Sequence, residues 1–131
     1  GCLPDYAILG AADHHLALAL IGSVDKSFPP KLRKSCPTYV NRLLELQRRC
    51  NRLINKNVGC VNGTVIHYYH GKIKDRKYRE RWAILTDNKF DLNTDVKKDW
   101  QGLLQLETYK PKLRDEIRLY FRQRNEDSID T

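Results

Sequence analysis

The chain has 131 residues, which fits one domain or part of one and allows a real hydrophobic core. Hydrophobic residues make up 40% of it and charged residues 31%, so the composition predicts a folded chain. No apolar run approaches the roughly 18 residues of a membrane-spanning helix. This excludes an integral membrane protein built from helices, and we expect a soluble, cytoplasmic chain.

The net charge of +8 favours an anionic partner such as a nucleotide, a nucleic acid or an acidic lipid. Four cysteines show no CxxC spacing, so neither a zinc ribbon nor a redox motif is indicated. A reduced chain is the default, with Cys36 and Cys50 at least half buried. Because methionine is absent even at position 1, we expect the interior of a longer protein.

The first block predicts a short strand followed by a buried helix. Tyr6 to Leu9 is an apolar, strand-like run, and Gly10 to Ala12 forms a turn of small residues. Asp13 can cap a helix that runs to about Val24, rich in Ala and Leu and therefore buried on most sides. Residues 25–37 read as a loop, because Pro29 and Pro30 forbid a continuing helix.

The middle of the chain predicts two helices around a β element. Apolar residues recur at the helical period over residues 38–56. Turn signals between β-branched runs then predict a strand or small hairpin over residues 58–68. Asp75 can cap a helix to about residue 87 in which Tyr78, Trp82 and Leu85 share a face, while Arg79 and Arg81 point elsewhere.

The last third predicts an acidic loop, a short helical or irregular segment around Trp100, and a helix over residues 111–124 with Pro111 in its first turn. The alternation of Asp91, Asn93 and Asp95 imitates a calcium loop. Its sixth position is Val rather than Gly and its twelfth is Gly rather than Glu, which excludes an EF-hand and favours turn and capping chemistry.

These elements predict a mostly helical α+β chain, with about four helices and a small β element, over residues 1–131 as a single domain or a domain fragment. The expected helices are residues 13–24, 38–56, 75–87 and 111–124.

Two histidine motifs are candidates for chemistry. His67 and His70 form an HxxH pair, and imidazole is a common ligand of divalent metals, although such pairs also occur as ordinary packed or surface residues. The ADHH stretch puts Asp13, His14 and His15 at the start of a helix. Asp13 can cap that helix or act as a general base, and at least one of the two histidines should leave the buried face.

A basic run follows the HxxH pair. Arginine and lysine suit phosphate, yet most charge runs are solvated helix faces, so the run alone identifies no ligand. Its members are Lys72, Lys74, Arg76, Lys77, Arg79 and Arg81.

Four stretches together resemble the C-terminal half of bacterial and phage-borne proteins similar to glycosyltransferases of the GT-A fold. They are GAADHHLALALIG, GTVIHYYHGKIKDRKYRERW, FDLNTDVKKDWQGLLQLE and KPKLRDEIRLYFRQRNED. The resemblance covers nearly the whole chain, and the HxxHGKxKDR run is its most specific part. GT-A enzymes bind the nucleotide through an N-terminal half ending in DxD. The sequence contains no DxD, so we expect the acceptor-side part, inactive alone.

The resemblance implies a role for each candidate. Asp13 would be the base in the acceptor site, with His14 and His15 lining the same cleft. His70, with His67 as second candidate, would hold the Mn²⁺ or Mg²⁺ that binds the donor diphosphate. Donor phosphates would meet Lys72, Lys74 and Arg76. The implied partners are a nucleotide-sugar donor and a glycan or other acceptor.

Two alternatives remain open. A basic nucleic-acid-binding or phage-associated module would use the arginines of residues 38–56 and the basic run, although no recognisable nucleic-acid motif supports it. A structural interaction domain would need no ligand. Clustering of Asp13, His67 and His70 in one cleft would favour the enzyme, and dispersal of these histidines with one continuous cationic face would favour nucleic acid. Weak, non-specific polyanion binding is expected in any case.

Overall fold

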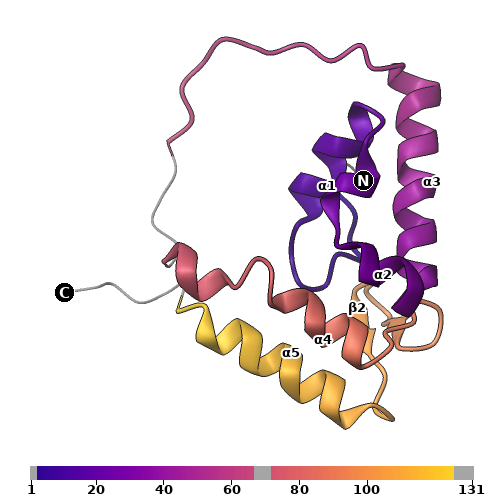
Figure 1. Ribbon diagram of the computed structural model, residues 1–131, viewed down its shortest axis with the longest axis vertical. Helices are drawn as coiled ribbons and strands as arrows, with labels where there is room; N and C mark the ends of the chain where they lie inside the picture. Colours follow the sequence, from indigo (N-terminus) through magenta and orange to yellow (C-terminus); the bar gives the residue numbers. More distant parts are fainter. Residues whose placement is uncertain (1–2, 67–71, 126–131) are drawn as a thin grey trace.

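The computed structural model of the chain describes residues 3–66 and 72–125. These residues form a mostly helical α+β fold, as predicted (Figure 1). In chain order the elements are α1 (Ala12–Leu20), the 3₁₀ turn η1 (Val24–Ser27), α2 (Pro30–Ser35), α3 (Pro37–Ile54), the 3₁₀ turn η2 (Ile73–Arg76), α4 (Arg81–Asp87), β1 (Val96–Lys98), β2 (Leu104–Leu106) and α5 (Pro111–Gln123).

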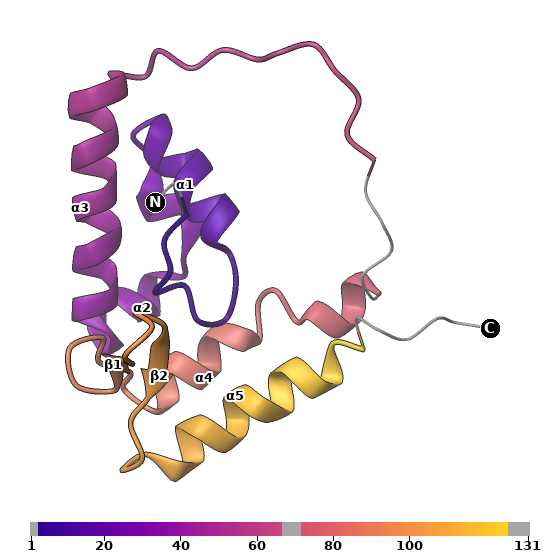
Figure 2. The same ribbon diagram turned by 180° about the vertical axis from the view of Figure 1, so that it is seen from behind.

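The first layer of the fold is α1 packed along α3, and both views of the ribbon show the two helices side by side (Figures 1 and 2). Pro37 is at the first-turn position that proline favours, and the buried residues of α3 recur at helical spacing: Tyr39, Val40, Leu43 and Cys50. The predicted helix over residues 38–56 is thereby confirmed. Cys36 and Cys50 are buried, as expected.

The second layer is α4, which packs against α2 on one side and α5 on the other (Figure 1). α5 begins at Pro111 and buries Leu113, Ile117 and Tyr120 along one stripe, which confirms the last predicted helix. Leu85 of α4 and Leu32 of α2 are almost fully buried and join this layer to the first. The core therefore lies between helices from both ends of the described chain.

Several predicted boundaries are wrong. The first helix ends at Leu20 and not near Val24, and the strand-like run from Tyr6 to Leu9 forms only an isolated bridge from Ile8 to Gly10. Residues 25–37 are not one loop, since Pro30 starts α2, where a proline at the first position of a helix loses no hydrogen bond. The residue before α1 is Ala11 in the left-handed region, and Asp13 lies in the first turn without capping. The helix expected from Asp75 begins at Arg81, because Asp75 belongs to η2 and Lys77 breaks the helical path with a φ of 43°.

The β element lies elsewhere than predicted. β1 and β2 form an antiparallel hairpin in which Val96 pairs with Leu106, in the region expected to be a loop and a short helix. The Asp99 carboxylate accepts backbone N–H groups of Gln101 and Leu103 and so closes the turn. Trp100 at its tip is 91% exposed. The turn role predicted for the acidic residues is therefore correct, and the short helical segment predicted around Trp100 is not.

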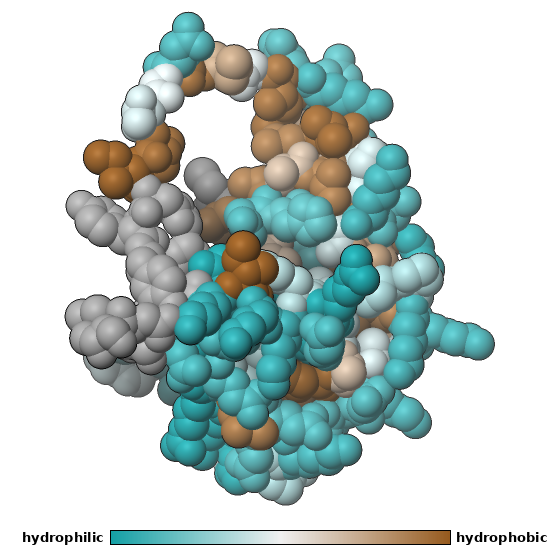
Figure 3. Space-filling model, turned by 60° about the vertical axis from the view of Figure 1, so that its left-hand side comes forward, coloured by the Kyte–Doolittle hydropathy of each residue, from teal (hydrophilic) through white to brown (hydrophobic). Residues whose placement is uncertain are grey.

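Residues 57–66 form an arch that leaves the end of α3 and stands away from the body (Figures 1 and 3). All of these residues are exposed, with Val61 at 96% and Val65 at 87%, and hydrophobic side chains are visible on the arch in Figure 3. The strand predicted over residues 58–68 is therefore wrong for 58–66, and 67–68 lie outside the described residues. β-branched residues favour a strand only where a partner strand lies alongside, and the described parts of the chain supply none.

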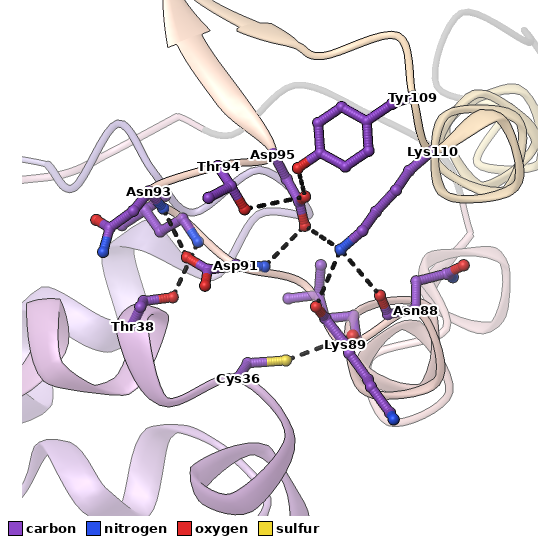
Figure 4. Close-up of polar contacts among 12 residues, drawn as sticks. Cys36, Thr38, Asn88, Lys89, Asp91, Asn93, Thr94, Asp95, Tyr109 and Lys110 are labelled. Carbon is purple, nitrogen blue, oxygen red and sulfur yellow. Dashed lines mark hydrogen bonds and ion pairs between the residues drawn. The ribbon is translucent and has the colours of Figure 1, made fainter.

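A buried ionic cluster fixes the hairpin to the helices (Figure 4). Asp95 is 2% exposed, and its carboxylate accepts hydrogen bonds from the Asp91 backbone N–H at 2.8 Å, from Lys110 Nζ at 2.7 Å and from the Tyr109 hydroxyl. Lys110 also reaches the carbonyl oxygens of residues 88 and 89 just after α4. The Asp95–Lys110 pair thus ties together the hairpin, the end of α4 and the start of α5. The expected turn and capping role of the acidic stretch is confirmed.

None of the helices over residues 3–66 and 72–125 is long and apolar enough to cross a membrane.

Candidate binding pocket

A pocket of about 580 Å³ lies where the start of α1, the segment after η1 and the start of α4 meet. His14 comes from α1, Lys26 to Pro29 come from η1 and the residues after it, and Tyr78 to Trp82 lead into α4. The pocket therefore brings the ADHH stretch and the end of the basic run together, although they are far apart in the sequence. Its lining residues are His14, Lys26, Ser27, Phe28, Pro29, Tyr78, Arg79, Arg81 and Trp82.

The lining combines flat apolar walls with positive charge. Phe28, Tyr78 and Trp82 contribute aromatic rings, while Lys26, Arg79 and Arg81 contribute cations. No carboxylate is among the described residues that line it. Apolar walls with a few polar groups are typical of small-molecule sites, and an excess of cations favours an anionic ligand.

His14 and Asp13 are both exposed in the first turn of α1, and His14 alone of the two lines the pocket. The prediction that at least one of the adjacent histidines leaves the buried face is confirmed. Asp13 immediately precedes His14 in the first turn of the same helix.

His15 lies in the core and not in the pocket, with 0% of its surface exposed. The Ser27 hydroxyl donates to the Val24 carbonyl at 2.6 Å, so it accepts from His15 Nδ1–H at 2.7 Å. His15 Nε2 then accepts the Tyr39 hydroxyl at 3.0 Å. Burial, with smaller contributions from the charges of His14 and Arg81, lowers the pKa of His15 to about 4. His15 is a neutral core residue that contacts two residues of the pocket lining, Ser27 and Trp82.

The three cations assigned to donor phosphates do not line the pocket. Lys72 and Lys74 are exposed around η2, and Arg76 Nη1 donates to the Tyr78 hydroxyl at 2.8 Å. Arg76 also contributes the carbonyl oxygen that accepts the Tyr120 hydroxyl at 3.2 Å, which holds η2 against α5.

The predicted metal ligands His67 and His70 lie outside the described residues. Among residues 3–66 and 72–125, no three His, Cys, Asp or Glu side chains converge as a metal site. The assignment of Mn²⁺ or Mg²⁺ to His70 and His67 therefore stays a prediction.

Arg81 is the residue that sequence reasoning missed. Predicted to point away from the buried face, it is instead 7% exposed. Its guanidinium lies 5.2 Å from the ring centre of Tyr78 and 5.4 Å from that of Trp82, and Nη1 donates to the Leu9 carbonyl at 3.1 Å. A spacing of four residues puts Arg81 on the same helix face as the buried Leu85, which was the available signal.

Gly10 makes room for this arginine. Its φ is 84°, which a residue with a side chain rarely adopts, and a Cβ there would lie 3.2 Å from Arg81 Nη1. The turn that enters α1 is thus shaped around the guanidinium.

Comparisons with known proteins found no matching family, no matching curated protein and no matching solved structure. The resemblance to GT-A glycosyltransferases rests on the quoted motifs alone.

Proposed function

We propose that the chain is the acceptor-side part of a metal-dependent, cytoplasmic glycosyltransferase that moves a sugar from a nucleotide-sugar donor to an acceptor. The observation that supports this most is the shared pocket of His14 and the Tyr78 to Trp82 segment. His14 belongs to the ADHH motif, and Tyr78 to Trp82 belong to the HxxHGKxKDRKYRERW motif. The resemblance assigns both motifs to one transfer site. A pocket lined from both is what a common site requires.

In this proposal Asp13 acts as the general base. Its exposed carboxylate takes the proton of the acceptor hydroxyl while the acceptor oxygen bonds to the anomeric carbon and the bond from that carbon to the diphosphate breaks. Lys72, Lys74 and Arg76 would lower the energy of the departing diphosphate by opposing its charge. His70, with His67 second, would hold Mn²⁺ or Mg²⁺, which supplies further positive charge there.

A second candidate function is polyanion binding along α3. Arg48, Arg49 and Arg52 are all exposed on that helix, away from the lining of the pocket. Without a recognition motif, we expect such binding to be weak, independent of sequence and lost as salt rises.

Paramagnetic NMR of the 131-residue chain separates the two candidates. Mn²⁺ with UDP or GDP should broaden the signals of His14 and of residues 78–82, because a bound paramagnetic ion acts on nearby nuclei. Mg²⁺ is the diamagnetic control. The variant His70→Ala should remove the broadening, and Lys31→Ala, an exposed cation on α2, should leave it unchanged.

Broadening centred on Arg48 to Arg52 would overturn the glycosyltransferase proposal in favour of polyanion binding. Absence of broadening with both nucleotides would remove its metal and donor components. In an active enzyme that contains this chain, Asp13→Asn should lower kcat more than the affinity for the donor.

A further inference from the structure

Arg81 carries a buried positive charge that no carboxylate neutralises within the described residues. Its one hydrogen bond there is donated by Nη1 to the neutral Leu9 carbonyl, and Nε is buried without an acceptor. No ion pair within 4.0 Å joins it to an acidic side chain among residues 3–66 and 72–125. Buried charges in proteins are normally paired or ligated.

Two acidic residues share a second pocket with Arg81. Glu80 and Glu116 line a separate pocket of about 200 Å³ between α4 and α5, which Arg81 also borders. Glu116 instead accepts a hydrogen bond from Asn88 Nδ2 at 2.6 Å, so its carboxylate is used elsewhere. Arg81 also lines the larger pocket, where no carboxylate is among the described lining residues.

The rings around Arg81 compensate its burial only in part. A cation over an aromatic face gains about 0.5–2 kcal/mol, whereas removing an ion from water costs several kcal/mol. An anion that enters the pocket would gain a counter-charge already positioned and already dehydrated. Arg81 is therefore set to be the main ligand-binding group of this pocket.

We propose that the pocket binds an oxyanion carried on a sugar ring, with Arg81 facing the anionic group. Trp82, Tyr78 and Phe28 offer flat surfaces for the apolar face of the ring, while Lys26 and Arg79 add positive charge. The volume of about 580 Å³ lies in the usual range for small-molecule sites. The acceptor of the transfer is then an acidic sugar, a step that rests on the proposed function; the oxyanion site itself does not.

The test uses Trp82 as the reporter. Trp100, the other tryptophan, is 91% exposed on the hairpin, so the variant Trp100→Phe leaves one indole beside Arg81. Fluorescence titrations at constant ionic strength compare glucuronate, glucose 6-phosphate, glucose and inorganic phosphate. We expect one of the two acidic sugars to bind at least tenfold more tightly than glucose and than inorganic phosphate.

The two acidic sugars distinguish the source of the oxyanion. Tighter glucuronate binding identifies a carboxylate, and tighter glucose 6-phosphate binding identifies a phosphate. Equal binding of glucose would overturn the role of Arg81, equal binding of inorganic phosphate would overturn recognition of a ring, and no binding of any of the four would overturn the site.

Variants in the Trp100→Phe background locate the effect. Arg81→Gln should weaken the tighter acidic sugar at least tenfold, whereas Arg48→Gln on α3 should leave its affinity unchanged. Unchanged binding in a folded Arg81→Gln overturns the proposal. If Arg81→Gln fails to fold, Arg79→Gln at the rim should weaken binding by about threefold, and unchanged binding in that variant then overturns the proposal. Acidic-sugar binding without any Mn²⁺–nucleotide broadening would support the oxyanion site and contradict glycosyl transfer. Mn²⁺–nucleotide broadening without acidic-sugar binding would support glycosyl transfer and contradict the oxyanion site.

Discussion

Asp95 and Arg81 are both charged and buried, yet their surroundings differ. Asp95 accepts hydrogen bonds from the Asp91 backbone, from the neighbouring Thr94 hydroxyl, and from Tyr109 and Lys110 just before α5, and the lysine opposes its charge (Figure 4). Arg81 has two aromatic rings and one carbonyl oxygen. The paired charge joins parts of the fold, whereas Arg81 has no acidic partner within the described residues and, in our proposal, is available to a ligand. Pairing, more than burial, separates a structural charge from a binding one.

The pKa of Asp95 is lowered by the groups that pair with its carboxylate. Although its burial would raise the pKa, hydrogen bonds from the Asp91 N–H, Lys110 and Tyr109 hold the pKa of Asp95 below its usual range. The native fold therefore favours the ionised carboxylate.

The largest expected effect comes from breaking this cluster. Asp95→Asn removes the charge opposite Lys110 and should lower the free energy of unfolding by about 3–4 kcal/mol, in the range for removing one partner of a buried pair. Urea unfolding measures the change. Glu107→Gln, which breaks the more exposed pair with Lys97, is the control and should cost about 0.5 kcal/mol or less. Similar losses in the two variants would contradict the structural role of Asp95.

His15 extends the comparison to a buried group that is neutral. Because its pKa is lowered from 6.5 to about 4, the unfolded chain binds a proton that the folded chain does not as the pH falls through this window. Stability is fully present above about pH 6.5 and is lost progressively toward pH 4. Between pH 7.5 and 4.5 the loss from His15 should be about 2.5 kcal/mol.

Urea unfolding at both pH values, on the wild type and on His15→Gln, checks this prediction. Glutamine keeps hydrogen-bonding capacity and does not titrate, so the variant should lose about 2.5 kcal/mol less across the interval. The pKa of Asp95 lies below this window, so it adds little to the slope. Identical slopes in the two proteins would show that His15 titrates equally in both states.

A smaller effect is expected at Arg81. Arg81→Met removes an unpaired buried charge and keeps an apolar chain between Tyr78 and Trp82, so the free energy of unfolding should change by about 1 kcal/mol or less. The same variant should lose the acidic sugar. A destabilisation as large as that of Asp95→Asn would mean that Arg81 is structural, and the contrast between the two charges would fail.

The smallest effect is expected on the arch. Val61→Asp replaces a side chain that is 96% exposed and packs against nothing described, so stability should change by about 0.5 kcal/mol or less in thermal unfolding. Leu43→Ala, at a residue with 0% exposure on α3, is the matched control and should cost about 2–5 kcal/mol. A large loss in Val61→Asp would show that the arch packs in solution.

The sequence predicted the helices best where one face is apolar. α3 and α5 begin with proline and bury residues at helical spacing, and both were predicted nearly to their ends. The arch shows the limit of this reasoning, because a β-branched run becomes a strand only beside a partner, which local pattern cannot supply. The hairpin was missed for the converse reason. Its strands are three residues each, and Asp99 defines the turn.

The pocket was predicted in part. The ADHH stretch and the basic run were expected to meet, and His14 does lie with Tyr78 to Trp82. Two residues differ from the expectation. His15 lies in the core between Ser27 and Tyr39 and does not line the cleft, and Arg81, expected to point away from the face of Trp82 and Leu85, is buried. Periodicity places apolar residues inside and charges outside, so it misses a charge that faces inward.

The most direct test of the unpaired charge is the NMR signal of the Arg81 Nε–H group, assigned by its absence in Arg81→Gln. Glucuronate and glucose 6-phosphate are titrated into the isotopically labelled chain, with glucose as the neutral control. The signal of Arg81 should shift with the tighter acidic sugar and stay fixed with glucose, while the signals of Arg48, Arg49 and Arg52 on α3 remain unchanged. A stationary Arg81 signal, or equal shifts of the α3 arginines, would contradict the assignment of Arg81 as the counter-charge of this pocket.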